Sequence, residues 1–107
     1  GKSRAKDLIL TARKLDAIEA AEMGLVNRTA PKAQLGAVAL ELAERISKNG
    51  PVAVRAAKDA IDAGCELSLT EGLEFEAECY SRTLETSDRL EALAAFSEKR
   101  KPNYQGE

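Results

Sequence analysis

Apolar side chains recur at intervals of three and four residues along most of the chain, which is the spacing of an amphipathic α-helix. Two segments show this most clearly, one after Pro31 and one after Ser68, and each carries charged residues on its other side. No segment combines β-branched residues with the alternation of a β-strand. We expect the first apolar face to be buried. The two faces consist of Leu35, Val38, Ala39, Leu42 and Ile46, and of Leu69, Leu73, Ala77, Tyr80 and Leu84.

Capping residues and helix breakers divide this pattern into separate helices. Asp16, Ser68 and Asp88 are each followed three residues later by a glutamate, which is the spacing of a capping box at a helix start. Gly24 is suited to end a helix and Pro51 to open one. The sequence therefore predicts one all-α domain over residues 1–107, with about six helices. The expected helices span residues 3–11, 17–23, 32–48, 51–63, 69–85 and 89–101.

The composition is that of a folded protein with a shallow core. The chain is 44% hydrophobic and 32% charged, which excludes a disordered protein. Alanine is the commonest apolar residue, and its methyl group contributes only a fraction of the roughly 1.5–3 kcal/mol of a buried leucine or phenylalanine. We therefore expect part of the apolar surface to face another domain or another subunit.

The charge balance and the lack of long apolar runs bear on possible partners. The 16 basic and 18 acidic residues give a net charge of −2, which creates no overall field for nucleic acid. No apolar run approaches the roughly 18–20 residues of a membrane span, so we expect a soluble protein with no membrane partner. The chain opens with Gly1 and reads as helix within a few residues. We expect it to be cut from a longer protein.

The residues that usually carry chemistry are scarce. The chain has no histidine, so the common general base is missing and the usual catalytic triads cannot form. No glycine-rich phosphate-binding motif occurs. Cys65 and Cys79, without histidine, do not predict a metal site, and we interpret both as small buried hydrophobic residues. The glutamates at positions 71, 74 and 78 have the spacing of a solvated helix face. We therefore predict no catalytic residue and no metal site.

One local feature is open to two interpretations. Phe96 stands three residues before Lys99, which begins the basic run Lys99-Arg100-Lys101 at the end of the last predicted helix. The cations could simply complement the helix dipole, which is worth about 0.3–1 kcal/mol. Alternatively, the ring and the ammonium group could flank a phosphorylated ligand. Periodicity alone favours the first interpretation.

Three motifs in order resemble one known family. Residues 5–27, which include Thr11-Ala12 and end in Gly24-Leu25-Val26-Asn27, are similar to a crotonase-superfamily stretch in which a helix precedes an "A-x-x-A-x-x-x-G-L-V" run. Residues 50–58 look like that superfamily's next helix start. Residues 88–102 resemble its terminal motif, "D-R-x-E-G-x-x-A-F-x-E-K-R-x-P". With Cys79-Tyr80, the chain looks most like methylglutaconyl-CoA hydratases and mitochondrial enoyl-CoA hydratase-like proteins.

The resemblance implies a fold and a role. The chain would be the C-terminal helical, trimerisation region of the crotonase fold, and the N-terminal spiral domain, which supplies the oxyanion hole and the catalytic acids, would be absent. Carried over residue by residue, the coenzyme A contacts would be Tyr80, Phe96 and Lys99. The intact protein would bind acyl-CoA as substrate without a further cofactor, as a homo-oligomer (trimer or dimer of trimers), in mitochondria or cytoplasm. Ala12 and Ala92 replace family glycines, and we expect both to favour helix continuity.

Two other functions stay open. The first is a non-catalytic helical interaction or oligomerisation module, which would use the exposed alanine-rich faces as its interface. The second is RNA binding, which some crotonase relatives show. Only the run Lys99-Arg100-Lys101 would support RNA binding, and the chain around it is net acidic. We therefore do not expect a nucleic-acid partner.

Overall fold

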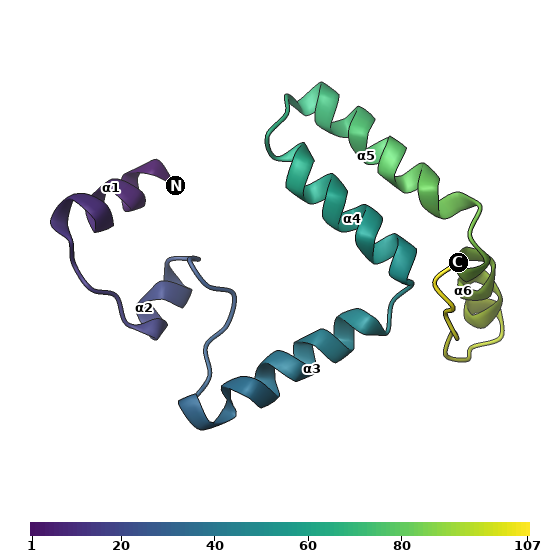
Figure 1. Ribbon diagram of the computed structural model, residues 1–107, viewed down its shortest axis with the longest axis horizontal. Coiled ribbons are helices and arrows are strands. Elements are labelled where there is room, and N and C mark those ends of the chain that lie inside the picture. The colour runs from purple at the N-terminus through teal and green to yellow at the C-terminus, as the bar shows by residue number, and fades with distance from the viewer. The chain divides into compact units, whose positions relative to one another are not determined.

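The computed structural model describes all residues from 1 to 107, and every regular element in it is helical (Figure 1). It contains six α-helices and one short 3₁₀ helix, and no strand. The all-α prediction is therefore confirmed. The elements are α1 (Lys2–Thr11), α2 (Ala17–Glu22), η1 (Lys32–Gln34), α3 (Leu35–Ser47), α4 (Pro51–Gly64), α5 (Leu69–Leu84) and α6 (Ser87–Ser97).

The contacts divide the chain into two compact units, Gly1–Ala39 and Leu40–Glu107, and the boundary falls within α3. In the first unit, the side chain of Asp16 accepts the Glu19 backbone N–H and caps α2, as predicted. The Glu19 carboxylate pairs with Arg13 at 2.7 Å. Gly24 takes the predicted left-handed conformation, with φ of 74°.

Ala12 departs from its prediction. The helix α1 does not continue through it, because Ala12 is the C-cap and lies in the left-handed region with φ of 51° and ψ of 27°. Its N–H donates to the Ile9 carbonyl oxygen. The turn is therefore kept although the residue that adopts it most easily, glycine, is missing.

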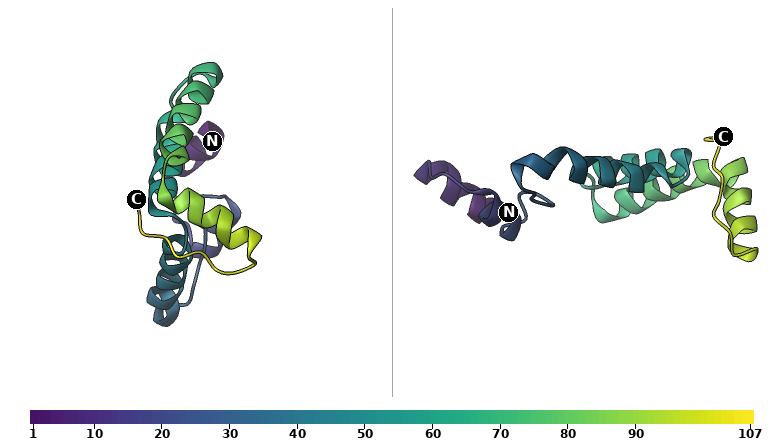
Figure 2. Two further views of the ribbon diagram at one scale, coloured as in Figure 1. Left: turned by 90° about the vertical axis from the view of Figure 1, so that its right-hand side faces the viewer. Right: turned by 90° about the horizontal axis from the view of Figure 1, so that it is seen from below.

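In the second unit, α4 and α5 form an antiparallel pair and pack on each other (Figure 1 and Figure 2). Pro51 opens α4, and Ser68 with Glu71 forms the predicted capping box of α5. The two helices approach closely where Gly64 faces Gly72: a β-carbon on Gly72 would lie 3.3 Å from the Gly64 carbonyl oxygen. Small side chains, rather than the large apolar ones, thus form this contact.

Very little of the apolar surface is buried within the chain. The buried apolar residues are Ala20, Ala56, Cys79 and Ala95. The predicted burial of the α3 face is wrong within this chain, because α3 has no buried residue and Leu35 is 59% exposed. The prediction that Cys65 is buried is also wrong, whereas Cys79 is buried as predicted. Many large apolar side chains lie exposed, as a surface that faces another domain or subunit would require.

Candidate functional site

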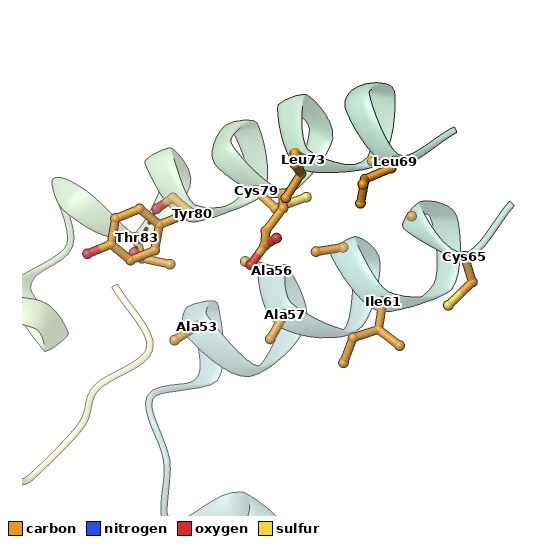
Figure 3. A pocket seen from close by; sticks show the side chains of 14 residues that line it. Ala53, Ala56, Ala57, Ile61, Cys65, Leu69, Leu73, Cys79, Tyr80 and Thr83 are labelled. Carbon is orange, nitrogen blue, oxygen red and sulfur yellow. Dashed lines mark hydrogen bonds between the residues drawn. The ribbon is translucent and has the colours of Figure 1, made fainter. Parts of the chain in front are cut away.

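A groove of about 650 Å³ runs between α4 and α5. Figure 3 shows Tyr80 and Thr83 towards one end of it and Cys65 and Leu69 towards the other. The lining is mainly apolar, with Glu76 as the only carboxylate and no cation. It consists of Ala53, Ala56, Ala57, Ala60, Ile61, Gly64, Cys65, Leu69, Gly72, Leu73, Glu76, Cys79, Tyr80 and Thr83. Such a surface can hold an apolar group, but it has no paired acid and base for proton transfer.

Tyr80 is the predicted site residue that lies on this groove. It belongs to α5, and 61% of the residue is exposed. It also borders a smaller cavity of about 200 Å³, together with Tyr104 of the C-terminal tail and Asp88. Tyr80 thus borders both the groove and the smaller cavity beside the C-terminal tail.

Phe96 and Lys99 lie at the end of α6 and border neither cavity. The prediction that α6 continues to about Lys101 is wrong, because the helix ends at Ser97. The Lys99 N–H donates to the Phe96 carbonyl oxygen at 3.3 Å, and the Arg100 N–H donates to the Ala95 carbonyl oxygen at 3.0 Å. These two bonds form a Schellman turn, in which Lys99 takes the left-handed position with φ of 55°. Phe96 is 87% exposed, so its ring is not buried within this chain.

Arg100 is held by two carboxylates. Its Nη1 and Nη2 donate to the two oxygens of Glu91 at 2.5 and 2.8 Å, and its Nε donates to Glu98 at 2.5 Å. The Asn103 N–H also donates to Glu91 at 2.7 Å. The Arg100 hydrogen bond, followed by the Asn103 N–H, lowers the pKa of Glu91 to about 2. The same bond, with that to Glu98, raises the already high pKa of Arg100.

Asp88 has a role that the sequence did not predict. The predicted N-cap at Asp88 is wrong, because Thr86 caps α6 and accepts the Arg89 N–H. Asp88 is instead buried, with 5% of the residue exposed. Its carboxylate accepts the N–H groups of Gln105 at 2.6 Å and Gly106 at 2.9 Å. It therefore holds the tail that returns alongside α6 (Figure 2).

The structure places the three predicted contact residues in two positions. Phe96 and Lys99 share the turn after α6, whereas Tyr80 lies on α5 at the groove. The residues that sequence reasoning missed are Asp88, Glu91 and Arg100, which fix that turn and the tail. The available indication was the pairing of acidic residues on α6 with a basic run beyond its end. Local spacing explains the acidic residues as a capping box and the basic run as cations at a helix C-terminus, so it does not reveal the ion pairs between them.

The glutamates of the predicted solvated face lie on α5. Glu71 belongs to the capping box, and Glu78 pairs with Arg82 at 2.9 Å. Both glutamates and Glu74 are exposed, as the interpretation of a solvated face requires.

No helix of the structure has the length and apolar character that crossing a membrane would demand.

Comparisons with known proteins agree with one another. The family model described as enoyl-CoA hydratase/isomerase matches residues 1–107. The chain is 52% identical over 106 residues to an Arabidopsis thaliana protein named probable enoyl-CoA hydratase 2, mitochondrial, and 48% identical over 111 residues to mouse methylglutaconyl-CoA hydratase, mitochondrial. These matches cover 99% and 100% of this chain and 35% of each relative. The chain thus spans about a third of the length of these curated relatives.

Solved structures give the same result. The crystal structure of an enoyl-CoA hydratase from Bacillus anthracis matches with a TM-score of 0.94 and 50% identity, over 97% of this chain and 40% of that one. A hydratase from Mycobacterium tuberculosis matches with a TM-score of 0.91 at 33% identity, over 98% of this chain and 42% of that one. These findings confirm the resemblance that the motifs indicated: the chain belongs to the enoyl-CoA hydratase/isomerase family, with the crotonase fold.

Proposed function

We propose that the chain is part of an enzyme that hydrates or isomerises enoyl-CoA thioesters, and that it contributes binding surface for coenzyme A and contacts between subunits. Hydration adds a hydroxyl to C3 and a hydrogen to C2 of the conjugated thioester, and isomerisation moves the double bond. Family membership supports this reaction class, since the relatives carry hydratase names. The substrate brings coenzyme A with it, and the proposal needs no further cofactor.

The observation that carries the proposed binding role is the conformation of Lys99. Lysine occupies the left-handed position of the turn, with φ of 55°, where glycine would fit without strain. A strained residue that persists on an exposed turn supports a role for its side chain. We assign its ammonium group to a phosphate at the adenosine end of coenzyme A. The exposed Phe96 ring would contact the adenine, and Tyr80 would contact the ligand from the groove.

The catalytic groups are proposed to lie outside these residues. The chain has no histidine, and the groove holds a single carboxylate. Stabilising the thioester oxyanion is the demanding part of the reaction, and one lost oxyanion donor typically costs about 10²–10³ in rate. The chain by itself is therefore proposed to be inactive.

The exposed apolar side chains support subunit contacts. Leu35 and Ile46 of α3 are 59% and 48% exposed, and Leu69 of α5 is 80% exposed. Large exposed apolar patches mark interaction surfaces. We propose a homo-oligomer, a trimer or a dimer of trimers, in mitochondria or in the cytoplasm. No membrane or nucleic-acid partner is part of the proposal.

The test uses a hydratase chimera, in which this chain replaces the segment of the Bacillus anthracis enzyme that it matches. Its rates are measured with crotonyl-CoA and with the analogue that lacks the 3′-phosphate on the adenosine. An exposed charge pair is worth up to about 1 kcal/mol, so Lys99→Gln should raise KM for crotonyl-CoA about three- to sixfold. The kcat should stay within about twofold, and the KM for the analogue should not change.

The control is Lys101→Gln, which removes the same charge two positions along the chain, where no ion pair is formed. It should leave both KM values within about twofold. If Lys99→Gln left the KM for crotonyl-CoA unchanged, the assignment of the phosphate to Lys99 would be wrong.

A second function is favoured by the exposed apolar faces: a non-catalytic interaction or oligomerisation module. Sedimentation of the isolated chain combined with a titration of coenzyme A separates the two. A folded oligomer that does not bind coenzyme A at millimolar concentration would support the module alone.

A further inference from the structure

The turn after α6 is closed by side chains on both sides of Lys99. Glu91 and Glu98 precede it and Arg100 and Asn103 follow it. Arg100 bridges the two glutamates, and the Asn103 N–H donates to Glu91 at 2.7 Å. The backbone that carries Lys99 is therefore tied to α6 by contacts that Lys99 itself does not make.

The guanidinium group of Arg100 is already occupied. Three of its nitrogen atoms donate to carboxylate oxygens at 2.5 to 2.8 Å. A guanidinium fork held by two carboxylates has little remaining charge to offer an anion, whereas Lys99 forms no ion pair. Within the basic run, Arg100 is thus paired with carboxylates, whereas Lys99 is not.

From this arrangement we propose that Arg100 and Glu91 are positioning residues, which hold the left-handed turn so that Lys99 is aimed at the phosphate of coenzyme A. Arg100 does not bind the phosphate itself. This inference rests on the proposed function, because it takes over the ligand assigned to Lys99. It adds that the binding strength depends on a side-chain pair that does not touch the ligand.

The competing account is that Arg100 binds the phosphate through its charge. Arg100→Lys separates the two, because lysine keeps the charge but cannot reproduce the bidentate fork on Glu91. If Arg100 positions Lys99, Arg100→Lys should raise KM as much as Arg100→Gln does. If Arg100 is a ligand, lysine should restore most of the binding.

The experiment measures KM and kcat of the hydratase chimera for crotonyl-CoA in the variants Arg100→Lys, Arg100→Gln and Glu91→Gln. All three should raise KM about two- to fivefold, with kcat within about twofold, because the ammonium group is displaced and the catalytic groups are not. None of them should raise KM further when Lys99 is already glutamine, since a positioning effect needs the residue that is positioned. Glu91→Gln probes the same contact should Arg100→Gln fail to fold.

Arg82→Gln is the matched control, because Arg82 also bridges two carboxylates, Glu78 and Asp59, but on α5 and α4. It should leave KM within about twofold. Hydrogen exchange of the Arg100 amide, which donates to the Ala95 carbonyl oxygen, reports the turn directly and should quicken in all three variants.

The outcomes separate the two proposals. If Lys99→Gln raises KM but Arg100→Lys behaves as the unmodified chimera, the positioning role is wrong and the proposed function stands. The same holds if the effects of Arg100→Gln and Lys99→Gln simply multiply. If Lys99→Gln itself has no effect, the phosphate assignment fails, and the positioning role fails with it.

Discussion

Gly72 of α5 lies so close to α4 that a β-carbon on it would stand 3.3 Å from the Gly64 carbonyl oxygen. The contact is made with backbone, which cannot rotate away as a side chain can. A β-carbon on Gly36 of α3, by contrast, would meet nothing within 4 Å. The two glycines therefore offer a matched pair.

Alanine should act differently at these two positions. Gly36→Ala should raise the free energy of unfolding by about 0.4–1 kcal/mol, because alanine restricts the unfolded chain. Gly72→Ala should not show this gain. Its free energy of unfolding should be about 1 kcal/mol lower than that of the unmodified chain, because α4 and α5 must move apart. Urea unfolding of both variants in the hydratase chimera measures the difference. Equal stabilisation at both positions would show that the helices separate freely.

At Ala12, in contrast to Gly36, glycine should be more stabilising than alanine. It occupies the left-handed C-cap of α1 with φ of 51°, where an L-residue is strained. Ala12→Gly should raise the free energy of unfolding by about 0.5–1 kcal/mol, because relief of the strain exceeds the added chain entropy. Gly24→Ala is the converse control, since Gly24 has φ of 74° and open space around it. It should destabilise by a similar amount, and a neutral result at Ala12 would argue against the left-handed turn.

The buried carboxylate of Asp88 should hold the tail. Asp88→Ala leaves the N–H groups of Gln105 and Gly106 without their acceptor and should cost about 1–3 kcal/mol. Hydrogen exchange should show both amides exchanging much faster, while amides in the middle of α5 keep their protection. Unchanged protection at Gln105 and Gly106 would contradict the assignment of Asp88 as their acceptor.

These cases show what the sequence can and cannot predict here. The caps at Asp16 and Ser68 were predicted because donor and acceptor lie three residues apart, so the pattern itself contains the contact. The pattern at Asp88 is the same, yet its partners are at residues 105 and 106, and no local spacing reveals a tail that returns.

The expected burial of the apolar face of α3 is wrong for a similar reason. Periodicity identifies an apolar face but not what covers it, so Leu35 and Leu69 lie exposed although each belongs to such a face. The close approach of α4 and α5 uses Gly64 and Gly72, which periodicity of large side chains overlooks. Of the proposed site, Tyr80, Phe96 and Lys99 came from the family resemblance, and the pair that holds the turn came only from the structure.

The Glu91–Arg100 pair should make stability depend on pH in a defined window. The folded-state pKa of Glu91, about 2, lies below its unfolded value near about 4.3. The pair therefore contributes fully above about pH 4.3 and loses its contribution as the pH falls through about 2. The Tm advantage of the unmodified chimera over Glu91→Gln should be constant from about pH 7 to 5 and vanish by about pH 2. An advantage that persists undiminished at pH 2 would be inconsistent with this pair.

We propose that this chain binds coenzyme A and contacts other subunits but does not carry the catalytic groups. Its most direct test is the rate of crotonyl-CoA hydration by the purified 107-residue chain, compared with the hydratase chimera under the same conditions. We predict turnover by the chimera and no rate above the uncatalysed reaction for the isolated chain. Hydration by the isolated chain at a rate within about 10²-fold of the chimera would contradict the account, because that is less than a single missing oxyanion donor typically costs.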